Sequence, residues 1–448
     1  MSLQHRVRGV PAGITTATDR WAIMLLGTTA VAICWPGWTT VALPTLTAAW
    51  RLLSWAARGS LVSVAGFTVI GSVFFGYIPL VLGVDLDRTS AVDAYVRWQL
   101  VGLAAFLLWG NQKRFRADLT PVRTRTDDGQ QSTRLFAALC GLGVLLASAA
   151  FLVRHGELPI LAADADEARQ SALHGGAALF ILAASLGLAC VVLLLSTHGS
   201  LRSQIGLISL VGVAAATGLG LAVGNRGTLV AIGMLAVALM LRKGGSLGLR
   251  VLVIAISGLL ALTAVVVVGG LRNPDIRGEA ATFYVSSFVN RASADTLVGS
   301  RIFELVDARG PYGPKAVAWA FAPYLPGTQP NLGQQMKSEL GLEFSGGGVT
   351  TPVAAEAIIL GPLLGVALQV LCVVATTLGI ARLARSRLLV FRVAGVSALP
   401  GIALLPSGGV LSTLSTFLVP TVAVLCAVAW FSSHEWRSAK HVQRHKAM

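Results

Sequence analysis

The chain has 448 residues, of which 54% are hydrophobic and only 12% are charged, and its formal net charge is +15. Soluble domains carry about 25% charged residues, so this composition excludes an ordinary soluble protein and indicates helices that span a membrane. The sequence lacks the alternating strand pattern of an outer-membrane barrel, and its positive charge lies in short connections between apolar runs, which argues against nucleic-acid binding.

Apolar stretches recur along the whole chain and predict an all-α, polytopic membrane protein. Pro36 and Gly37 interrupt the first stretch, which is either one kinked span or a tight hairpin running on towards Trp55. Eleven transmembrane helices are therefore expected, or twelve. The predicted spans are residues 21–43, 61–83, 93–110, 134–153, 174–196, 204–222, 227–241, 250–270, 354–378, 388–406 and 410–431.

The distribution of lysine and arginine predicts which connections face the cytoplasm. The basic connections, expected inside, are 111–134, 242–250, 382–392 and the tail 437–446. Alternation then places three segments outside, namely 154–174, 224–227 and 271–353. The N-terminus stays open, because three spans before residue 111 place it outside, whereas a hairpin at Pro36 places it inside.

The polar segment 271–353 is the expected centre of function. A loop of this length is uncommon unless it is functional or disordered. Aromatic residues such as Phe283, Phe303 and Trp319 argue against disorder, so we expect a folded extracytoplasmic loop. The chain accordingly divides into N-terminal helices with a basic loop (1–133), central helices with the 154–174 outer loop (134–270), the large loop (271–353), and C-terminal helices with a basic tail (354–448).

Arginines at the outer face are the candidate binding groups. Arg226 lies in a short turn between two apolar runs, where a charged side chain either serves a function or extends to lipid headgroups. Arg291 and Arg301 lie in the large loop and suit phosphate oxygens, although salt bridges within the loop are the alternative. The seven histidines do not cluster and no zinc or P-loop motif is present, so we expect no metal and no cofactor.

Three stretches form a recognisable set. Residues 156–161 are followed by acidic residues and Arg169, a short turn holds Arg226, and a glycine-rich exit from the large loop leads through 350–352 to Glu356 and the 361–365 stretch. This set resembles the outer-loop pattern of bacterial O-antigen and oligosaccharide repeat-unit polymerases (Wzy type). The resemblance covers roughly residues 150–380. The residues after Glu356 depart from the run that often follows it in that family.

The resemblance implies a membrane glycosyltransferase whose donor is a polyprenyl-diphosphate-linked oligosaccharide and whose site faces outward from the cytoplasmic membrane. Arg226 and Arg291 are the expected stabilisers of the departing diphosphate. Glu356 is either the general base for the acceptor hydroxyl or a helix cap. The expected substrate-binding residues are Arg169, Arg277, Arg301 and Tyr324.

The resemblance also implies partners, and two alternative functions stay open. Membrane lipid, a flippase and a chain-length regulator are the expected partners, and no nucleic acid is expected. A ligase that transfers the glycan to another acceptor is the nearest alternative function. A flippase or transporter is the third, and it is disfavoured because acidic and basic residues are scarce within the spans.

Overall fold

The computed structural model describes residues 13–58, 60–84, 89–117, 119, 127–156, 158–162, 165–196, 204–242, 281–322, 330–342 and 349–446. Within these ranges the chain forms helices joined by turns and loops, and no strand. Eight helices there are long and apolar enough to cross a membrane, and Arg20–Cys34 and Gly227–Arg242 are shorter apolar helices. The all-helical membrane character predicted from composition is therefore confirmed.

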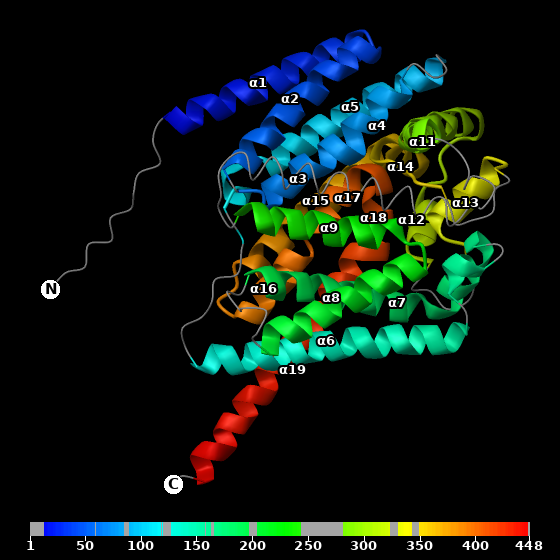
Figure 1. Cartoon of the computed structure of the whole chain (residues 1–448). Helices are drawn as coiled ribbons and strands as arrows, with labels where there is room; N and C mark the ends of the chain where they lie inside the picture. Colours follow the sequence, from blue (N-terminus) through cyan, green and yellow to red (C-terminus); the bar gives the residue numbers. More distant parts are fainter. Residues whose placement is uncertain are drawn as a thin grey trace.

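The long helices lie side by side in a bundle, with consecutive helices running in opposite directions (Figure 1). They are α1 (Gly13–Cys34), α2 (Trp38–Ala57), α3 with α4 (Val64–Ser72 and Ile78–Gly83), α5 (Ser90–Gly110), α6 (Asp127–His155), α7 (Ala165–Ser196), α8 (Gln204–Ala222), α9 (Arg226–Arg242), α15 (Pro362–Ala384), α16 with α17 (Leu389–Ser397 and Leu399–Gly408), and α18 with α19 (Val410–Thr413 and Val419–Lys446). One π-helical turn joins α3 to α4 and another joins α18 to α19, so each pair continues as one element.

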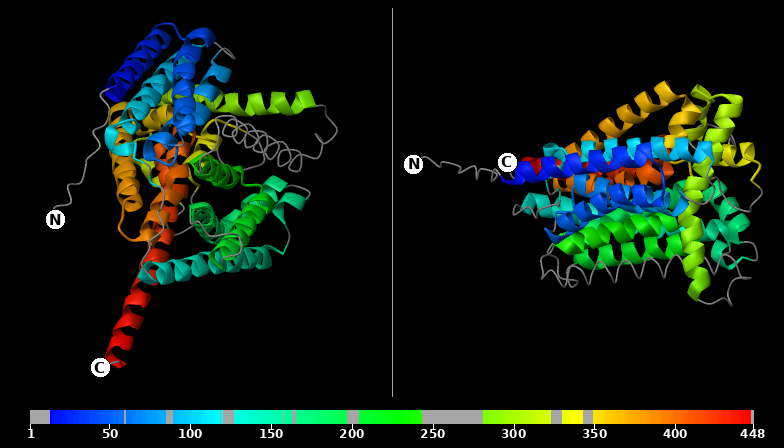
Figure 2. Two further views of the ribbon diagram at one scale, coloured as in Figure 1. Left: turned by 60° about the vertical axis from the view of Figure 1, so that its left-hand side comes forward. Right: turned by 90° about the horizontal axis from the view of Figure 1, so that it is seen from above.

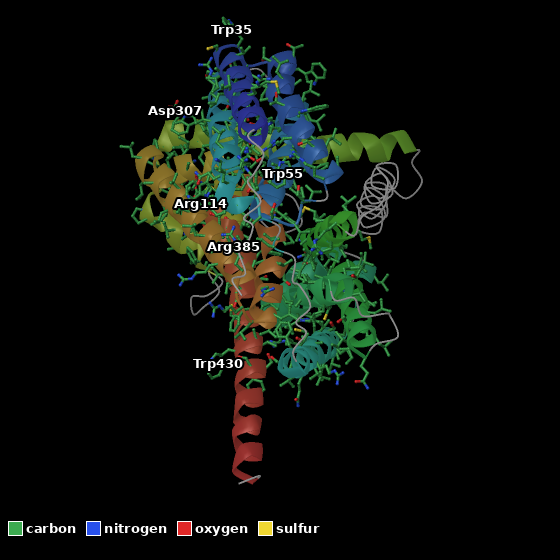
Figure 3. The ribbon with its side chains drawn as sticks, turned by 90° about the vertical axis from the view of Figure 1, so that its left-hand side faces the viewer. Trp35, Trp55, Arg114, Asp307, Arg385 and Trp430 are labelled. Atoms are coloured by element: carbon green, nitrogen blue, oxygen red, sulfur yellow. The ribbon has the colours of Figure 1, made fainter. Side chains whose placement is uncertain are left out.

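The two ends of this bundle differ in charge. One end, termed the basic end, carries the start of α1, the connection after α5, the α15–α16 turn and the tail of α19 (Figures 1 and 2). Figure 3 looks onto the basic end, where the Arg385 guanidinium donates a hydrogen bond to the carbonyl oxygen of Arg114. The opposite end is termed the loop end. Because basic connections mark the cytoplasmic side, we predict that the basic end faces the cytoplasm.

The predicted first span, 21–43, is in fact two helices. α1 and α2 form an antiparallel hairpin that turns at residues 35–37 (Figure 1). Pro36 cannot donate a helical hydrogen bond, and Gly37 is extended (φ −173°, ψ 165°), so the first helix ends there. The hairpin brings the N-terminal end of α1 to the basic end, which is the second of the two alternatives that the sequence left open.

Two further predicted boundaries are wrong. The span 354–378 is divided at Gly361, whose φ of 97° ends the short helix α14 (Val353–Leu360) before α15 begins at Pro362. Residues 165–174, expected in an outer loop, belong to the first turns of α7. The predicted span 250–270 lies outside the described residues.

Four further helices of the described residues cover the loop end and form the loop-end layer: α11 (Ala281–Arg309), which is long, and the short α12 (Pro314–Ala320), α13 (Leu332–Glu339) and α14. α11 runs across the bundle, nearly perpendicular to the long helices (Figure 2). Its Thr296 hydroxyl donates to the Pro79 carbonyl at 3.1 Å, and the Phe303 ring meets Tyr95 edge-on at 5.8 Å. The described part of the 271–353 segment is thus folded and rests on α4 and α5.

The hairpin generates a topology test through Cys34, which is an exposed thiol at the end of α1. In a variant whose other four cysteines are replaced by alanine, we expect a membrane-impermeant maleimide to label Cys34 from the side that labels Ser338→Cys in α13. Arg387→Cys, between α15 and α16, should be labelled only from the opposite side. Labelling of Cys34 and Arg387→Cys from one side would contradict the hairpin.

Candidate functional site

The chain re-enters the bundle before α14. Ala354, in the first turn of α14, donates its backbone N–H to the Oε1 atom of Gln99 at 3.0 Å. Gln99 is the tenth residue of α5, which places it about 14 Å along that helix from the loop end. The other end of α14 lies in the loop-end layer, where the Ile359 carbonyl accepts from the Tyr312 N–H at 2.8 Å. α14 is therefore a half-length helix whose N-terminus lies inside the bundle.

The turn between α17 and α18 is recessed to the same depth. The Pro406 carbonyl, in the last turn of α17, accepts a hydrogen bond from Gln99 Nε2 at 3.3 Å. Gln99 therefore contacts both the first turn of α14 and the last turn of α17. Polar backbone at membrane depth is tolerated where it is buried within protein, as it is here.

Glu356 joins these two recessed segments. Its carboxylate is fully buried and accepts hydrogen bonds from the backbone N–H groups of Leu411 (2.9 Å) and Ser412 (3.1 Å) at the start of α18. The Ser412 hydroxyl and Gln369 Nε2 also donate to it, at 3.3 and 3.1 Å. A negative charge at this position complements the exposed N–H groups of a helix N-terminus. Glu356 is thus a cap, and the helix it caps is α18, not its own.

Two hydroxyl groups extend this polar cluster. The Thr351 hydroxyl lies 3.4 Å from that of Ser412, and the neighbouring Thr350 hydroxyl donates to the Asp295 carboxylate on α11. Thr351 and Glu356 are buried, whereas Thr350, Ser412 and Asp295 are partly exposed. A chain of polar groups therefore leads from the buried carboxylate towards the loop-end layer.

Two of the predicted arginines lie in the first two turns of helices at the loop end of the bundle's other half. Arg226 is the first residue of α9, and Asn225 caps that helix by accepting the Thr228 N–H at 3.1 Å. Arg169 is in the second turn of α7 and is half-buried. Arg226 therefore lies at a helix N-terminus, where the aligned peptide dipoles favour a bound anion, and Arg169 lies one turn further into its helix.

The large-loop candidates are more dispersed. Arg301 lies on the exposed face of α11, opposite the buried Ile302 and Phe303, and Arg291 lies in an earlier turn of the same helix. Within the described residues, no hydrogen bond or ion pair joins Arg301 to Glu356. Arg277 and Tyr324 lie outside the described residues.

Comparison of the chain with models of known protein families, with curated proteins and with solved structures finds no match in any of the three. The function therefore has to be argued from the site itself.

Sequence reasoning missed the neutral polar residues that hold the re-entrant segment. Gln99 and Gln369 lie in apolar spans, and Gln369 Nε2 also donates to the Val353 carbonyl at 2.9 Å. Polar side chains at such depth are rare and need partners, so an amide in mid-span was an available signal.

A half-exposed aromatic pair lies in the loop-end layer. The rings of Tyr312 and Trp319 are 5.2 Å apart and inclined by 58°. Burial, with a further contribution from the Glu339 carboxylate, raises the pKa of the Tyr312 hydroxyl above its ordinary value. Such a pair offers a ring face to a polar ligand such as a sugar.

Replacing Glu356 by glutamine tests the cap. The amide NH₂ must face one of two N–H donors, those of Leu411 or Ser412, so a buried donor loses its acceptor. We expect the free energy of unfolding to fall by about 1–3 kcal/mol, measured as a lower Tm of the purified protein in detergent. The control is Glu339→Gln, which breaks an exposed 3.0 Å ion pair with Arg309 and should change stability by at most about 1 kcal/mol. Equal Tm values for the two variants would contradict the cap.

Gly409 provides a second test of the recessed turn. It has a φ of 72°, and an added Cβ would lie 2.5 Å from the Thr351 carbonyl oxygen and 2.7 Å from Glu356 Oε1. We expect Gly409→Ala to cost at least about 1–3 kcal/mol of stability from the backbone conformation alone. Gly379→Ala, in α15 with no heavy atom within 4 Å of the added methyl, should be neutral or stabilising. A Gly409→Ala protein with wild-type Tm would contradict the described turn.

Proposed function

We propose that the chain is a glycosyltransferase of the cytoplasmic membrane that joins polyprenyl-diphosphate-linked oligosaccharide repeat units at its loop end. One observation carries the proposal. The folded layer α11–α14 covers the same end of the apolar bundle at which Arg226 begins α9 and Arg169 lies in the second turn of α7 (Figure 1). A polymerase is favoured over the ligase alternative only by the sequence resemblance.

The substrate's chemistry fits this division of the molecule. A polyprenyl chain belongs in the bilayer beside apolar helices, its diphosphate belongs at the membrane surface, and its glycan belongs in water. The loop end offers cations at helix N-termini for the diphosphate and the Tyr312–Trp319 pair for the sugar rings. These groups lie at the loop end, where the membrane-anchored diphosphate is proposed to meet the protein.

The proposed chemistry is substitution at the donor sugar. An acceptor hydroxyl oxygen forms the new bond to the anomeric carbon, and the bond to the diphosphate oxygen breaks. Arg226 is proposed to stabilise the negative charge that develops on the departing diphosphate, with Arg291 and Arg301 from α11 and Arg169 and Arg277 supporting. The acceptor's proton leaves to a base, and no metal is required in this scheme.

Glu356 is proposed to act through position. Four donors hold its carboxylate, so accepting a proton from a substrate would break the cap of α18. Asp295 is the more accessible carboxylate on the same side, since it is partly exposed and lies on α11. Glu356 instead fixes the relative placement of α14, α15 and α18 beneath the loop-end layer.

The direct experiment uses the full-length protein reconstituted with lipid-linked oligosaccharide extracted from the host's own membranes. Release of free polyprenyl diphosphate together with a ladder of longer lipid-linked glycans is the expected result. A single transfer to a different lipid acceptor would indicate the ligase instead. Movement of the substrate across the membrane without release of polyprenyl diphosphate would contradict a transferase.

Arg226 gives the sharpest test of this function. If its guanidinium binds the leaving diphosphate, Arg226→Ala should lower the rate by about 100-fold or more, and Arg226→Lys should restore only part of it because an ammonium lacks the bidentate fork. The readout is polyprenyl diphosphate release, normalised to protein abundance.

The matched control is Arg242, at the opposite end of the same helix and at the basic end. Arg242→Ala should retain activity, because the same charge is removed far from the loop end. Wild-type turnover by Arg226→Ala would exclude Arg226 from the site.

A further inference from the structure

A second cluster of polar side chains lies at the basic end, within the α1–α2 hairpin. Arg51, on α2, is 7% exposed, and its guanidinium carbon lies 5.0 Å from the Trp21 ring and 5.6 Å from the Trp55 ring. Its Nη2 atom donates to the Asn111 side-chain oxygen at 2.9 Å. A buried arginine is costly unless it is paired, and aromatic faces offset only part of that cost.

Two buried donors in this cluster lack an acceptor. In the described part of the chain, neither Arg51 Nε nor Trp55 Nε1 has a hydrogen-bond partner. The two residues are four apart on α2, so they lie on one face of the helix. Buried N–H groups are nearly always satisfied in native proteins, so a pair of neighbouring orphan donors indicates an acceptor between or beside them.

The surroundings favour an acceptor that carries negative charge. Arg58 and Arg116 are close enough to repel Arg51 electrostatically. Arg58 is exposed at the end of α2, seven residues from Arg51 and therefore on the same face, and its guanidinium bonds the neutral oxygens of Ser54. Arg116 is half-buried and its Nε donates to the Asn111 carbonyl at 2.6 Å. Three guanidinium groups, two from α2 and one from the connection after α5, thus lie close enough to interact electrostatically.

We propose that this cluster binds a phosphate group, supplied by the headgroup of an anionic phospholipid in the leaflet at the basic end. Phosphate oxygens match the arginine fork and accept several N–H donors at once. Arg51 is six residues from the end of α2, about 9 Å along the helix axis, which is within reach of the headgroup layer. The site lies at the opposite end from the proposed catalytic site and does not depend on the proposed function.

The test measures thermal unfolding of the delipidated full-length protein in detergent during titration with dioleoylphosphatidylglycerol. A saturable rise in Tm is expected, with little or no rise for zwitterionic dioleoylphosphatidylcholine. Inorganic phosphate provides the second arm. A rise with inorganic phosphate equal to that with the anionic lipid would support a phosphate site whose ligand is soluble, and a rise with neither would overturn the proposal.

Trp55→Phe is the decisive variant, because it removes the orphan N–H and keeps a smaller aromatic ring beside Arg51. Trp55 is buried, so the smaller ring should lower the lipid-free Tm, and half-saturation with the anionic lipid should need about tenfold more lipid. Arg51→Gln should abolish the response. Arg387→Gln, which removes an exposed charge at the same end, is the control and should respond as the wild type does. Identical titrations for wild type, Trp55→Phe and Arg387→Gln would overturn the site.

Discussion

The carboxylate of Glu356 and the N–H groups that begin α18 form the contact on which the loop end depends. Glu356 lies on α14, its donors lie on α18, and Gln369 of α15 donates to the same carboxylate. One buried charge thus holds two consecutive helices, α14 and α15, to the start of α18, which lies 55 residues further along the chain. The contact also explains the recessed α17–α18 turn, because the N–H groups of Leu411 and Ser412 can leave water only if an acceptor meets them inside the bundle.

The re-entrant segment follows from this contact. α14 can turn outward next to α15 because Gly365 lets the two helices approach closely, since a Cβ there would lie 2.2 Å from the Ala357 carbonyl oxygen. Gln99 then satisfies both the first turn of α14 and the last turn of α17. The layer α11–α13 rests on this platform through the Ile359 carbonyl and through Thr350 and Asp295. A rigid platform of this kind is what a site assembled from several helices requires.

The two ends of the bundle differ in their charged groups. At the loop end, carboxylates and arginines are mixed: Asp295 and Glu356 lie within the polar cluster, and Arg301 and Glu304 lie on the exposed face of α11. At the basic end, the hydrogen bonds described for Arg51, Arg58 and Arg385 go to neutral oxygens. We propose that the two ends bind different ligands, a lipid-linked glycan at the loop end and the phosphate layer of the bilayer at the basic end.

The sequence by itself determined the class of the protein. The length of the apolar runs predicted the helices, and the lysines and arginines in short connections predicted which connections share one end of the bundle. Run length and loop charge can both be read locally, because the bilayer imposes both. Pro36 marked a break in the first span but could not choose between a kink and a hairpin, since that choice depends on the packing of α1 against α2. Glu356 was a candidate from its place after a glycine-rich loop, yet its partners lie 55 and 56 residues away. The division at Gly361 and the roles of Gln99 and Gln369 were likewise decided by tertiary structure, because a polar group's partner inside a bundle is set by which helices meet there and not by its neighbours in the chain.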